Sequence, residues 1–518
     1  MRKTVDIALI PEDVSSDAAI RRALSSALGR QYSRLNTYKI LKRSIDARSR
    51  RVVYRMQVEV FLDEDNLAEP LVFHYQNVSL GLPVIIVGAG PAGLFAALRC
   101  IENGFRPIVL ERGKDVKQRR RDLAAINKEG VVNTESNYCY GEGGAGTYSD
   151  GKLYTRSNKR GDINKVLAMF VQHGASEDIL IDARPHIGTN KLPNIITAMR
   201  ETILSAGGEV QFGKKVTDLH VADGRIRGVE INGAELLSAN AVILATGHSA
   251  RDIYELLFKK GIAVEPKPFA LGVRIEHPQN VIDSAQYRCD IRSEFLPPAY
   301  YSLVEQVGER GVFSFCMCPG GIIAPCATDE NEVVVNGWSP SKRNNPFANS
   351  GTVVQVTLDD VEGDHPLKMM HFQAEIERKA FEAGGGDLVA PAQRMIDFVE
   401  DRLSATLPKN SYLPGTKSSR LKDILPDFVA GSLRKALPVF GRKMKGYYTN
   451  EAIIVGVESR TSAPVRIPRD QTSLQHPQVA GLFPCAEGAG YAGGIVSAAI
   501  DGINCADAAA LFLGNAGS

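Results

Sequence analysis

The first 62 residues alternate between strand-like and helix-like spacing of hydrophobic positions. Apolar and polar side chains alternate in residues 4–10 (TVDIALI) and 51–62 (RVVYRMQVEVFL), as they do in half-buried strands. Between them, residues 18–32 (AAIRRALSSALGRQY) place apolar side chains at helical spacing. The pattern predicts a small N-terminal β-α-β module of the ferredoxin-like type.

A continuous apolar strand then leads into a glycine-rich turn and an apolar helix. Residues 83–113 read PVIIVGAGPAGLFAALRCIENGFRPIVLERG. In a dinucleotide-binding fold, Gly88 makes the tight turn, Gly90 lets the backbone approach a diphosphate, and Gly93 lets the helix pack on the strand. A glycine-rich surface loop is the alternative, but strand, helix and second strand follow in register. The segment therefore predicts a dinucleotide site.

An acidic residue, Glu111, follows at the end of the second strand. At this distance from the glycines it is placed to accept hydrogen bonds from the ribose hydroxyls of an adenosine. A carboxylate there disfavours a 2′-phosphate, so FAD or NAD is expected rather than NADP. The helix that begins near Gly90 also directs its positive end and unpaired N–H groups toward the phosphates.

The rest of the chain divides into further segments that differ in hydrophobic pattern and in Pro and Gly content. Helical spacing over 192–208, strand and turn patterns over 208–233 and a strand over 241–247 continue the nucleotide-binding domain. A region of short strands, many Pro and Gly, and charged helices around 371–385 and 392–405 then reads as an insertion, before the chain returns to the first domain. The predicted segments are 1–80 (N-terminal module), 81–258 (FAD-binding domain, first part), 259–450 (inserted substrate domain) and 451–518 (FAD-binding domain, C-terminal part).

The predicted fold class is therefore α/β: a Rossmann-like FAD-binding domain with an inserted mixed-β substrate domain and the small N-terminal module. At 518 residues the chain exceeds what one hydrophobic core usually serves. Its 44% hydrophobic and 23% charged residues are typical of a globular protein.

Net charge and cysteine content indicate which binding partners and which cellular compartment to expect. The net charge of +2 argues against a whole-molecule attraction to nucleic acid or membrane. No signal peptide and no uninterrupted membrane-spanning stretch are recognised. Eight cysteines without a C-x-x-C pair favour reduced thiols in a cytoplasm, and no metal site is expected.

A local excess of positive charge lies in the N-terminal module. From Arg21 to Arg55 there are 11 Lys and Arg against the single acid Asp46. Such a patch could meet RNA, an acidic partner or an acidic substrate. A solvated face balanced by acids elsewhere is the simpler interpretation, because no interleaved aromatic platform accompanies the charge.

Three further glycine-rich segments carry candidate chemistry. Residues 140–153 (YGEGGAGTYSDGKL) would let backbone amides approach a planar ligand, and residues 244–249 (LATGHS) turn directly after a strand. Residues 486–494 (AEGAGYAGG) repeat G-x-G-x-x-G, yet only one helix follows them, so they do not form a second nucleotide fold. We expect Glu487 to bond a ribityl hydroxyl and the helix beginning near Gly494 to aim its positive end at the flavin N1 and C2 carbonyl.

These motifs, with LATGHSARD, KPFALGVRIEHPQ, FSFCMCPGG, GVESRTSAPVRI and AEGAGYAGGIVSAAIDG, resemble the bacterial family of uncharacterised FAD-dependent dehydrogenases. More distantly, the chain is similar to flavoproteins of the glutathione-reductase type. The resemblance covers nearly the whole chain and implies one bound FAD and a redox role. One departure is Ala486-Glu487-Gly488, where many flavoproteins have Gly-Asp.

Motifs and resemblance together give the residues expected at the cofactor. They are Gly88, Gly90, Pro91, Ala92, Gly93, Glu111, Arg112, Gly143, Gly144, Ala145, Gly146, Val216, Ala245, Thr246, Gly247, Glu487, Gly488, Gly490, Gly493, Gly494 and Ile495. Because the sequence has no second complete nucleotide fold, NAD(P)H would have to bind transiently at the substrate face. Tyr491 could cover one face of the flavin.

The candidates for acting on a small-molecule substrate are Arg274, His277, Cys316, Cys318 and Arg460. Arg460, with Arg466, could clamp a carboxylate or phosphate, or instead form a salt bridge to an acid such as Glu458. The two cysteines could be a redox relay, a soft-metal pair or a buried structural pair, and the last is favoured because free cysteines are commonly buried. His277 is likewise favoured as a hydrogen-bonded structural residue.

The function predicted from these features is hydride transfer between an organic substrate and flavin N5. Two alternatives stay open: a flavin monooxygenase, and an RNA-associated or regulatory flavoprotein that docks through the basic N-terminal segment.

Overall fold

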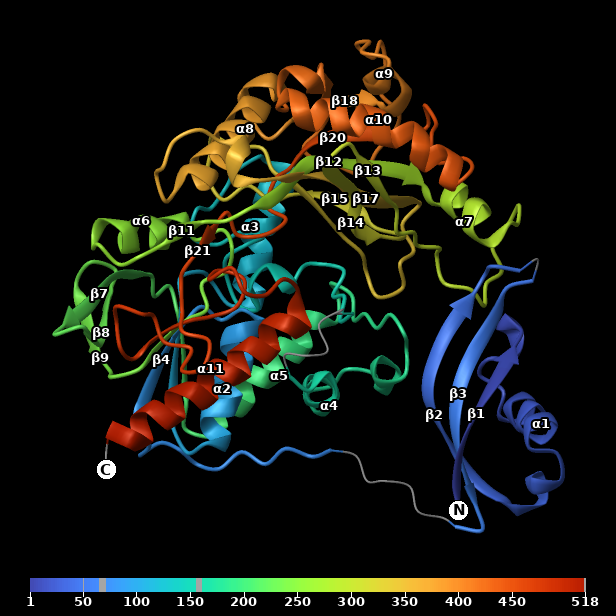
Figure 1. Cartoon of the computed structure of the whole chain (residues 1–518), viewed down its shortest axis with the longest axis horizontal. Coiled ribbons are helices and arrows are strands. Elements are labelled where there is room, and N and C mark those ends of the chain that lie inside the picture. The colour runs from blue at the N-terminus through green and yellow to red at the C-terminus, as the bar shows by residue number, and fades with distance from the viewer. Residues whose placement is uncertain (50, 65–70, 155–160, 517–518) are drawn as a thin grey trace.

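The computed structural model describes residues 1–49, 51–64, 71–154 and 161–516. Its N-terminal module is a three-stranded antiparallel sheet of order β1-β3-β2 with one helix packed on it (Figure 1). The elements are β1 (Arg2–Leu9), α1 (Asp17–Leu28), β2 (Leu35–Asp46) and β3 (Val53–Leu62). Ser16 caps α1 by accepting a hydrogen bond from Ala19 N.

The strand β2 is a departure from the β-α-β pattern expected from the sequence. Its alternation is interrupted by register shifts against β3 between Leu35 and Thr37 and between Ile40 and Lys42. Bulges of this kind break the two-residue period that identifies a strand, and so the module has one strand more than predicted.

Five basic residues of this segment pair with acids, most of which lie outside the segment: Arg21, Arg34, Arg43, Arg48 and Arg55. Arg43 Nε lies 2.7 Å from Asp182 Oδ1 of the next domain, and Arg55 Nε lies 2.6 Å from Asp46 Oδ2. Arg34 pairs with Asp63 in the same way. These ion pairs reduce the positive excess that the sequence alone indicates, and RNA docking stays a prediction.

The first large domain is built on a five-stranded parallel sheet of order β22-β10-β4-β5-β6. Its strands are β4 (Pro83–Val87), β5 (Arg106–Glu111), β6 (Glu209–Phe212), β10 (Val242–Leu244) and β22 (Leu482–Pro484). A smaller antiparallel sheet has the order β7 (Val216–Ala222), β8 (Arg225–Ile231), β9 (Glu235–Ser238). The helices are α2 (Pro91–Glu102), α3 (Val116–Lys128), α4 (Ile163–Gln172), α5 (Leu192–Ser205), α6 (Arg251–Lys259) and α11 (Ile495–Ala516).

The last helix, α11, lies alongside α2 in the core of this domain (Figure 1). A Cβ added to Gly502 would be 2.1 Å from Ala92 O, so the two backbones meet closely. Among the described residues, Ile495–Gly514 is the stretch long and apolar enough to cross a bilayer, and 61% of its apolar window is buried inside the fold. Its burial therefore fits a core helix.

The second large domain is built on a seven-stranded sheet of order β13-β14-β17-β12-β20-β18-β19. The strands are β12 (Phe269–Pro278), β13 (Val304–Val307), β14 (Arg310–Cys318), β17 (Phe347–Val356), β18 (Ala390–Arg394), β19 (Thr416–Ser418) and β20 (Ile453–Glu458). The helices are α7 (Gln279–Tyr287), α8 (Lys368–Gly384), α9 (Met395–Val399) and α10 (Asp427–Lys443). Two short ladders complete the fold, β15 (Ile322–Pro325) with β16 (Val335–Trp338) and β11 (Glu265–Pro266) with β21 (Val465–Arg466).

Two sequence expectations about this domain need correction. The sequence places residues 453–458 in the returning FAD-binding segment 451–518, yet they form β20, which pairs with β12 and β18 inside the second domain. The domain boundary therefore lies beyond Glu458. The helix expected over 392–405 is only the short α9, because Ala392 and its neighbours form β18 against β20.

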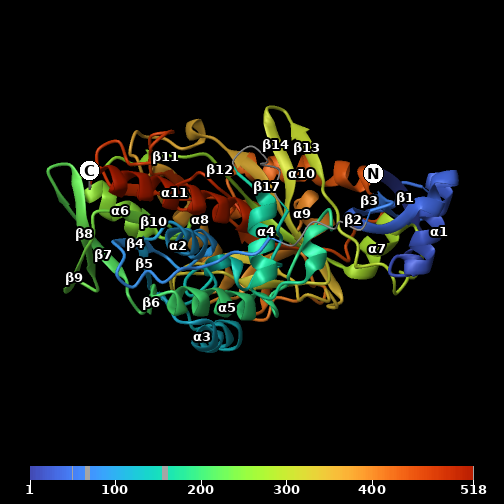
Figure 2. The ribbon, with the colours of Figure 1, turned by 90° about the horizontal axis from the view of Figure 1, so that it is seen from below.

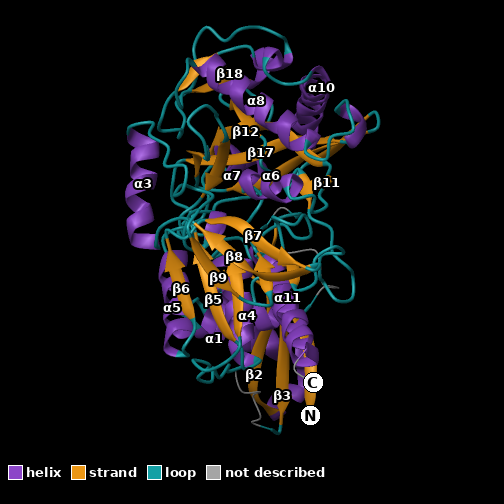
Figure 3. Cartoon of the chain, turned by 90° about the vertical axis from the view of Figure 1, so that its left-hand side faces the viewer, coloured by secondary structure: helices purple, strands orange, loops and turns teal. Residues whose placement is uncertain are grey.

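The domains are stacked so that the second covers one end of the parallel sheet of the first. Figure 3 shows α8, α10, β12 and β17 on one side and β5, β6 and α11 on the other. The N-terminal module and the β7–β9 sheet lie at opposite ends of the molecule in Figures 1 and 2. Because the second domain covers this end of the parallel sheet, the two large domains face each other along the edge where β4, β5 and β10 end.

The packing of α2 on β4 predicts a large effect of one methyl group. A Cβ at Gly93 would lie 1.9 Å from Gly88 O, which forces strand and helix apart. We expect Gly93→Ala to lower the free energy of unfolding by roughly 3 kcal/mol in urea titrations. As a control, Gly431→Ala in α10, where a Cβ meets nothing within 4 Å, should leave stability equal or slightly higher. Equal stability of the two variants would contradict this packing.

Candidate functional site

A cavity of about 410 Å³ lies between the two large domains. Its first-domain wall comes from the turns after β4, β5 and β10, the 144–152 loop and the start of α11. Its second-domain wall comes from Phe315, Cys316 and Cys318 of β14, the β16 residues 336 and 337, and residues 460 and 461. Segments far apart in the sequence thus meet around one space.

The turn between β4 and α2 presents bare backbone to the cavity. Gly88 has φ +105°, and a Cβ there would lie 2.5 Å from Ala245 O. Gly90 caps α2 with φ −74°, and the nearest atom to its would-be Cβ is Gly144 Cα at 3.9 Å. Gly90 therefore faces open space, beside the unpaired N–H groups of the first turn of α2.

Glu111 occupies the end of β5, and its carboxylate borders the same space. One oxygen accepts hydrogen bonds from Gly113 N at 2.8 Å and Gly141 N at 3.0 Å, and the other from Ala89 N at 2.9 Å. Backbone N–H groups from three segments thus fix the carboxylate at the cavity, where its remaining lone pairs can accept from a ribose. The next residue, Arg112, pairs with Glu135 at 2.6 Å and with Asp252 at 2.9 Å.

The opposite end of the first-domain wall is formed by the turn after β10 and the start of α11. Thr246 lines the cavity, and its Oγ1 is buried without a hydrogen-bond partner. Gly493 and Gly494 are exposed, and nothing lies within 4 Å of a Cβ added to either. An unsatisfied hydroxyl and an open helix N-terminus are features that a polar ligand would complete.

Most of the residues expected at the cofactor line this one cavity. The residues that line it are Gly88, Gly90, Pro91, Ala92, Glu111, Arg112, Gly144, Ala145, Gly146, Val216, Ala245, Thr246, Gly247, Glu487, Gly493, Gly494 and Ile495. The four others, Gly93, Gly143, Gly488 and Gly490, lie behind the lining. A Cβ on each would strike neighbouring atoms, such as Gly247 N at 2.8 Å from Gly488, so they serve close packing.

Tyr491 does not lie on the cavity lining. Its ring packs beneath Arg469, whose guanidinium carbon is 4.0 Å from the ring centroid, and its hydroxyl accepts a hydrogen bond from Arg469 N at 3.0 Å. Arg466 also lies over this ring, at 5.6 Å, rather than in the cavity. The structure therefore places Tyr491 and Arg466 together outside the site.

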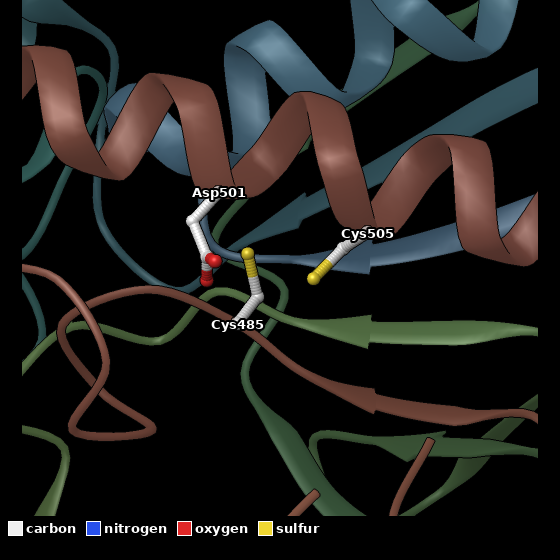
Figure 4. A group of neighbouring side chains, drawn as sticks. All are labelled: Cys485, Asp501 and Cys505. Carbon is white, nitrogen blue, oxygen red and sulfur yellow. The ribbon is translucent and has the colours of Figure 1, made fainter. Parts of the chain in front are cut away.

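A buried group of polar side chains supports the turn from below. Cys485, Asp501 and Cys505 lie close together (Figure 4), with their ligand atoms within 4.8 Å of one another. Asp501 accepts from Ala486 N at 2.6 Å and pairs with Arg469 at 2.7 Å. Because the Arg469 guanidinium already neutralises this carboxylate, we interpret the group as one that stabilises the turn at Ala486 rather than as a metal site.

On the second-domain wall, Cys316 opens onto the cavity. It has φ +44° and lies at a register shift between β14 and β17, where the strand bulges. Its side chain is exposed. Cys318 is buried beside it, with Sγ 3.3 Å from Cys316 O. The two thiols thus have different exposure to a ligand.

Arg274, expected to contact the substrate, is fully buried behind this wall. It pairs with Glu458 at 2.8 Å and donates to Asn349 Oδ1 and to Cys316 O, each at 2.8 Å. Its guanidinium does not reach the cavity lining, so the structure gives it no direct contact with a ligand there.

His277 is likewise buried in the seven-stranded sheet, away from the cavity. Its Nε2 donates to Tyr447 O at 2.8 Å, and its Nδ1 has no partner. Burial therefore lowers the pKa of His277 to about 4, despite the bond to the carbonyl. The structure supports the structural interpretation of this residue.

Arg460 lines the cavity, but its guanidinium is engaged by buried acids. It pairs with Glu332 at 2.5 Å and Glu377 at 3.1 Å, and donates to Thr328 Oγ1 at 2.7 Å. Although burial opposes ionisation, the charges of Arg251 and Arg460 hold the pKa of Glu377 well below its usual range. The salt bridge considered for Arg460 is thus formed with these acids, and Glu458 pairs with Arg274 instead.

Among the polar lining residues that sequence reasoning missed, Lys152, His248 and Asn336 bear on the chemistry of the cavity. His248 Nε2 donates to Arg460 O at 3.0 Å, and so joins the turn after β10 to the second domain. Lys152 and His248 stand inside motifs quoted above, and their polar character within glycine-rich turns was an available signal. Asn336 carries no such signal, because its side chain is positioned by Arg274, 62 residues earlier in the sequence.

The fold and the cavity define a flavoprotein that holds a dinucleotide between two domains. Bare backbone at Gly90, a fixed acid at Glu111 and an open helix end at Gly494 fit FAD, the cofactor of the families that match. A family described as "FAD-dependent protein, C-terminal domain-like" matches residues 268–461, and "FAD binding domain" matches residues 83–119. Residues 1–61 match a domain family of unknown function.

A protein of Clostridium beijerinckii, recorded as "Uncharacterized protein", is 41% identical over 90% of this chain and 91% of its own length. The chain therefore belongs to the same family of FAD-dependent proteins. Thiamine thiazole synthase of Thermotoga maritima is 25% identical over 42% of this chain and 75% of its own. The solved structure of CtdE in complex with FAD is 13% identical, with a TM-score of 0.32 and 84% of each chain covered.

The open space at Gly90 predicts a selective loss of cofactor. Gly90→Val should fold, since φ −74° suits valine, but its side chain would fill the space of the diphosphate. We expect at least roughly a hundredfold weaker FAD binding, measured by flavin absorbance after reconstitution. Gly431→Val in α10 is the matched control and should retain flavin. A Gly90→Val protein that purifies with stoichiometric FAD would place the phosphates elsewhere.

The buried His277 predicts a specific dependence of stability on pH. Its folded-state pKa of about 4 lies below the ordinary value of 6.5, so its contribution is complete above pH 6.5 and is lost as pH falls toward 4. The loss amounts to roughly 3 kcal/mol. His277→Gln, which keeps a donor for Tyr447 O, should flatten the fall in unfolding free energy, whereas exposed His74→Gln should not. An unchanged pH profile in His277→Gln would show that His277 is not the titrating group.

Proposed function

We propose that this protein is a FAD-dependent dehydrogenase or reductase that moves a hydride between an organic small molecule and the flavin. The observation that carries the proposal is the form of the cavity. One end has the bare backbone and the acid of a dinucleotide fold, and the other is closed by side chains of a second domain. FAD, when bound, supplies the flavin N5 that accepts or releases hydride.

The residues of the first domain bind and orient the cofactor. The turn at Gly88 and Gly90 and the start of α2 receive the diphosphate, and Glu111 accepts from the ribose. The start of α11 at Ile495 directs its positive end into the cavity and favours negative charge there.

The residues of the second domain close the space in which the substrate would lie. Phe315, Cys316 and Gly337 form a wall opposite the 144–152 loop. Such closure excludes water and holds two reactants in a fixed orientation, which are the main contributions a protein makes to hydride transfer. As a possible electron donor, NAD(P)H would bind in the cavity only transiently. We also propose a cytoplasmic location, as expected from the sequence.

The test is anaerobic. The FAD-loaded protein is photoreduced, and metabolite pools are screened for a compound that restores the oxidised flavin spectrum with a stoichiometric reduced product. Free FAD and apo Gly90→Val protein, treated identically, are the controls. We expect at least one organic compound to reoxidise the protein-bound reduced flavin much faster than it reoxidises free reduced FAD. Conversely, the reduced form of that compound should reduce the bound oxidised flavin faster than free FAD.

Two outcomes would overturn the proposal. Reoxidation by O₂ alone, with a hydroxylated product and NADPH consumption, would make the protein a monooxygenase. A flavin that exchanges electrons with no organic compound would favour a regulatory flavoprotein.

A further inference from the structure

The second-domain wall of the cavity is organised by the buried guanidinium of Arg274. This group donates to Cys316 O at 2.8 Å and to Asn336 Oδ1 at 3.3 Å, and its Nη2 lies 3.7 Å from Cys318 Sγ. Glu458 holds it from behind at 2.8 Å. One fixed cation therefore sets the position of three groups on or next to the cavity lining.

The amide of Asn336 is oriented by this arrangement. Its Oδ1 accepts from Arg274 and from Gly337 N, the latter at 2.7 Å. Because arginine has donors and no acceptor, the oxygen must face Arg274, and the two Nδ2 hydrogens face away from it. Among the described residues Nδ2 has no hydrogen-bond partner, and Asn336 lines the cavity. The side chain therefore offers donors to a ligand.

Lys152 brings a positive charge to the same wall from the first domain. Its Nζ donates to Met317 O and lies 3.9 Å from Cys318 Sγ, the sulfur that Arg274 also approaches. The nearest acid is Asp150 at 3.9 Å, but Arg343 already pairs with Asp150 at 2.7 Å. About a third of the Lys152 side chain is exposed.

The other charged groups at this end are neutralised within the protein. Arg274 is balanced by Glu458, while Arg460 and Arg251 are balanced by Glu332 and Glu377. Lys152 shares the carboxylate of Asp150 with the closer Arg343, so the charge of Lys152 is compensated only in part. A ligand with a negative group would gain a charge-assisted hydrogen bond there.

We propose that Lys152 and Asn336 form an anion subsite of the flavin cavity, with Arg274 as its positioning residue, and that the substrate is an organic acid whose carboxylate is held there. This inference rests on the proposed function, since it assigns the substrate class of the same cavity. One carboxylate oxygen accepts from the Lys152 ammonium and the other from the Asn336 amide, which fixes the substrate relative to the flavin.

The experiment titrates the FAD-loaded protein with oxalate and with its neutral diamide, oxamide, and follows the visible spectrum of the flavin. We expect oxalate to perturb the spectrum saturably and oxamide to have little effect. Lys152→Met and Asn336→Asp should each weaken oxalate binding by roughly tenfold or more, because each removes a donor to a charged group. Lys152→Arg should recover part of the affinity.

Lys342→Met is the matched control, because Lys342 is exposed and does not line the cavity. It removes the same charge and should bind oxalate as the wild type does. Asn336→Asp keeps an acceptor for Arg274, so its flavin content should stay normal even if Lys152→Met fails to fold.

Failure of the subsite is distinguishable from failure of the proposed function. Flavin-loaded protein that ignores oxalate, that binds oxamide equally well, or that binds oxalate undiminished in both Lys152→Met and Asn336→Asp would overturn the anion subsite alone. Protein that cannot retain FAD would instead overturn the function on which the subsite rests.

Discussion

The close approach of bare backbone segments around one end of the cavity is the constraint on which the rest of the structure depends. Gly90 and Gly144 face each other across a gap in which a Cβ on Gly144 would lie 3.1 Å from Gly90 Cα. Gly88 meets the turn after β10 equally closely, and Gly488 packs on Gly247. Four segments distant in the sequence therefore meet without side chains between them, and backbone amide groups line much of this end of the cavity.

The other end of the cavity is formed by hydrogen-bonded and charged side chains instead of bare backbone. Its wall contains buried charges, each set in a closed group: Arg274 with Glu458, and Arg251 and Arg460 with Glu332 and Glu377. Buried ion pairs contribute little net stability compared with apolar packing, but they fix the groups they bond. Here they fix the peptide at Cys316, the amide of Asn336 and the junction between the domains near His248.

Local sequence patterns were sufficient to predict the first-domain elements that line the cavity. They were insufficient to predict the second-domain wall. The strand, turn and helix around Gly88–Gly93 and the role of Glu111 as a carboxylate at the cavity followed from spacing, because each of these features is encoded within about thirty residues. The terminal glycine turn and α11 followed for the same reason. The cofactor class and the family were predicted from motifs and are confirmed by the matching families.

What sequence reasoning could not provide depends on contacts between distant segments. Arg274 and His277 lie on opposite faces of β12, and only the place of β12 between β17 and β20 inside the second domain buries both. The acids that engage Arg460 come from residues 332 and 377, so its occupied guanidinium has no local signature. For the same reason β20 was assigned to the wrong domain, and Asn336 was not recognised.

The most direct test of the central claim is a crystal structure of the FAD-loaded protein. The diphosphate should lie against Gly88 and Gly90, the ribose against Glu111, and the isoalloxazine between the 144–152 loop and the start of α11, with its free face toward Cys316 and Asn336. A diphosphate bound elsewhere, or a flavin ring outside the space between the two domains, would contradict it.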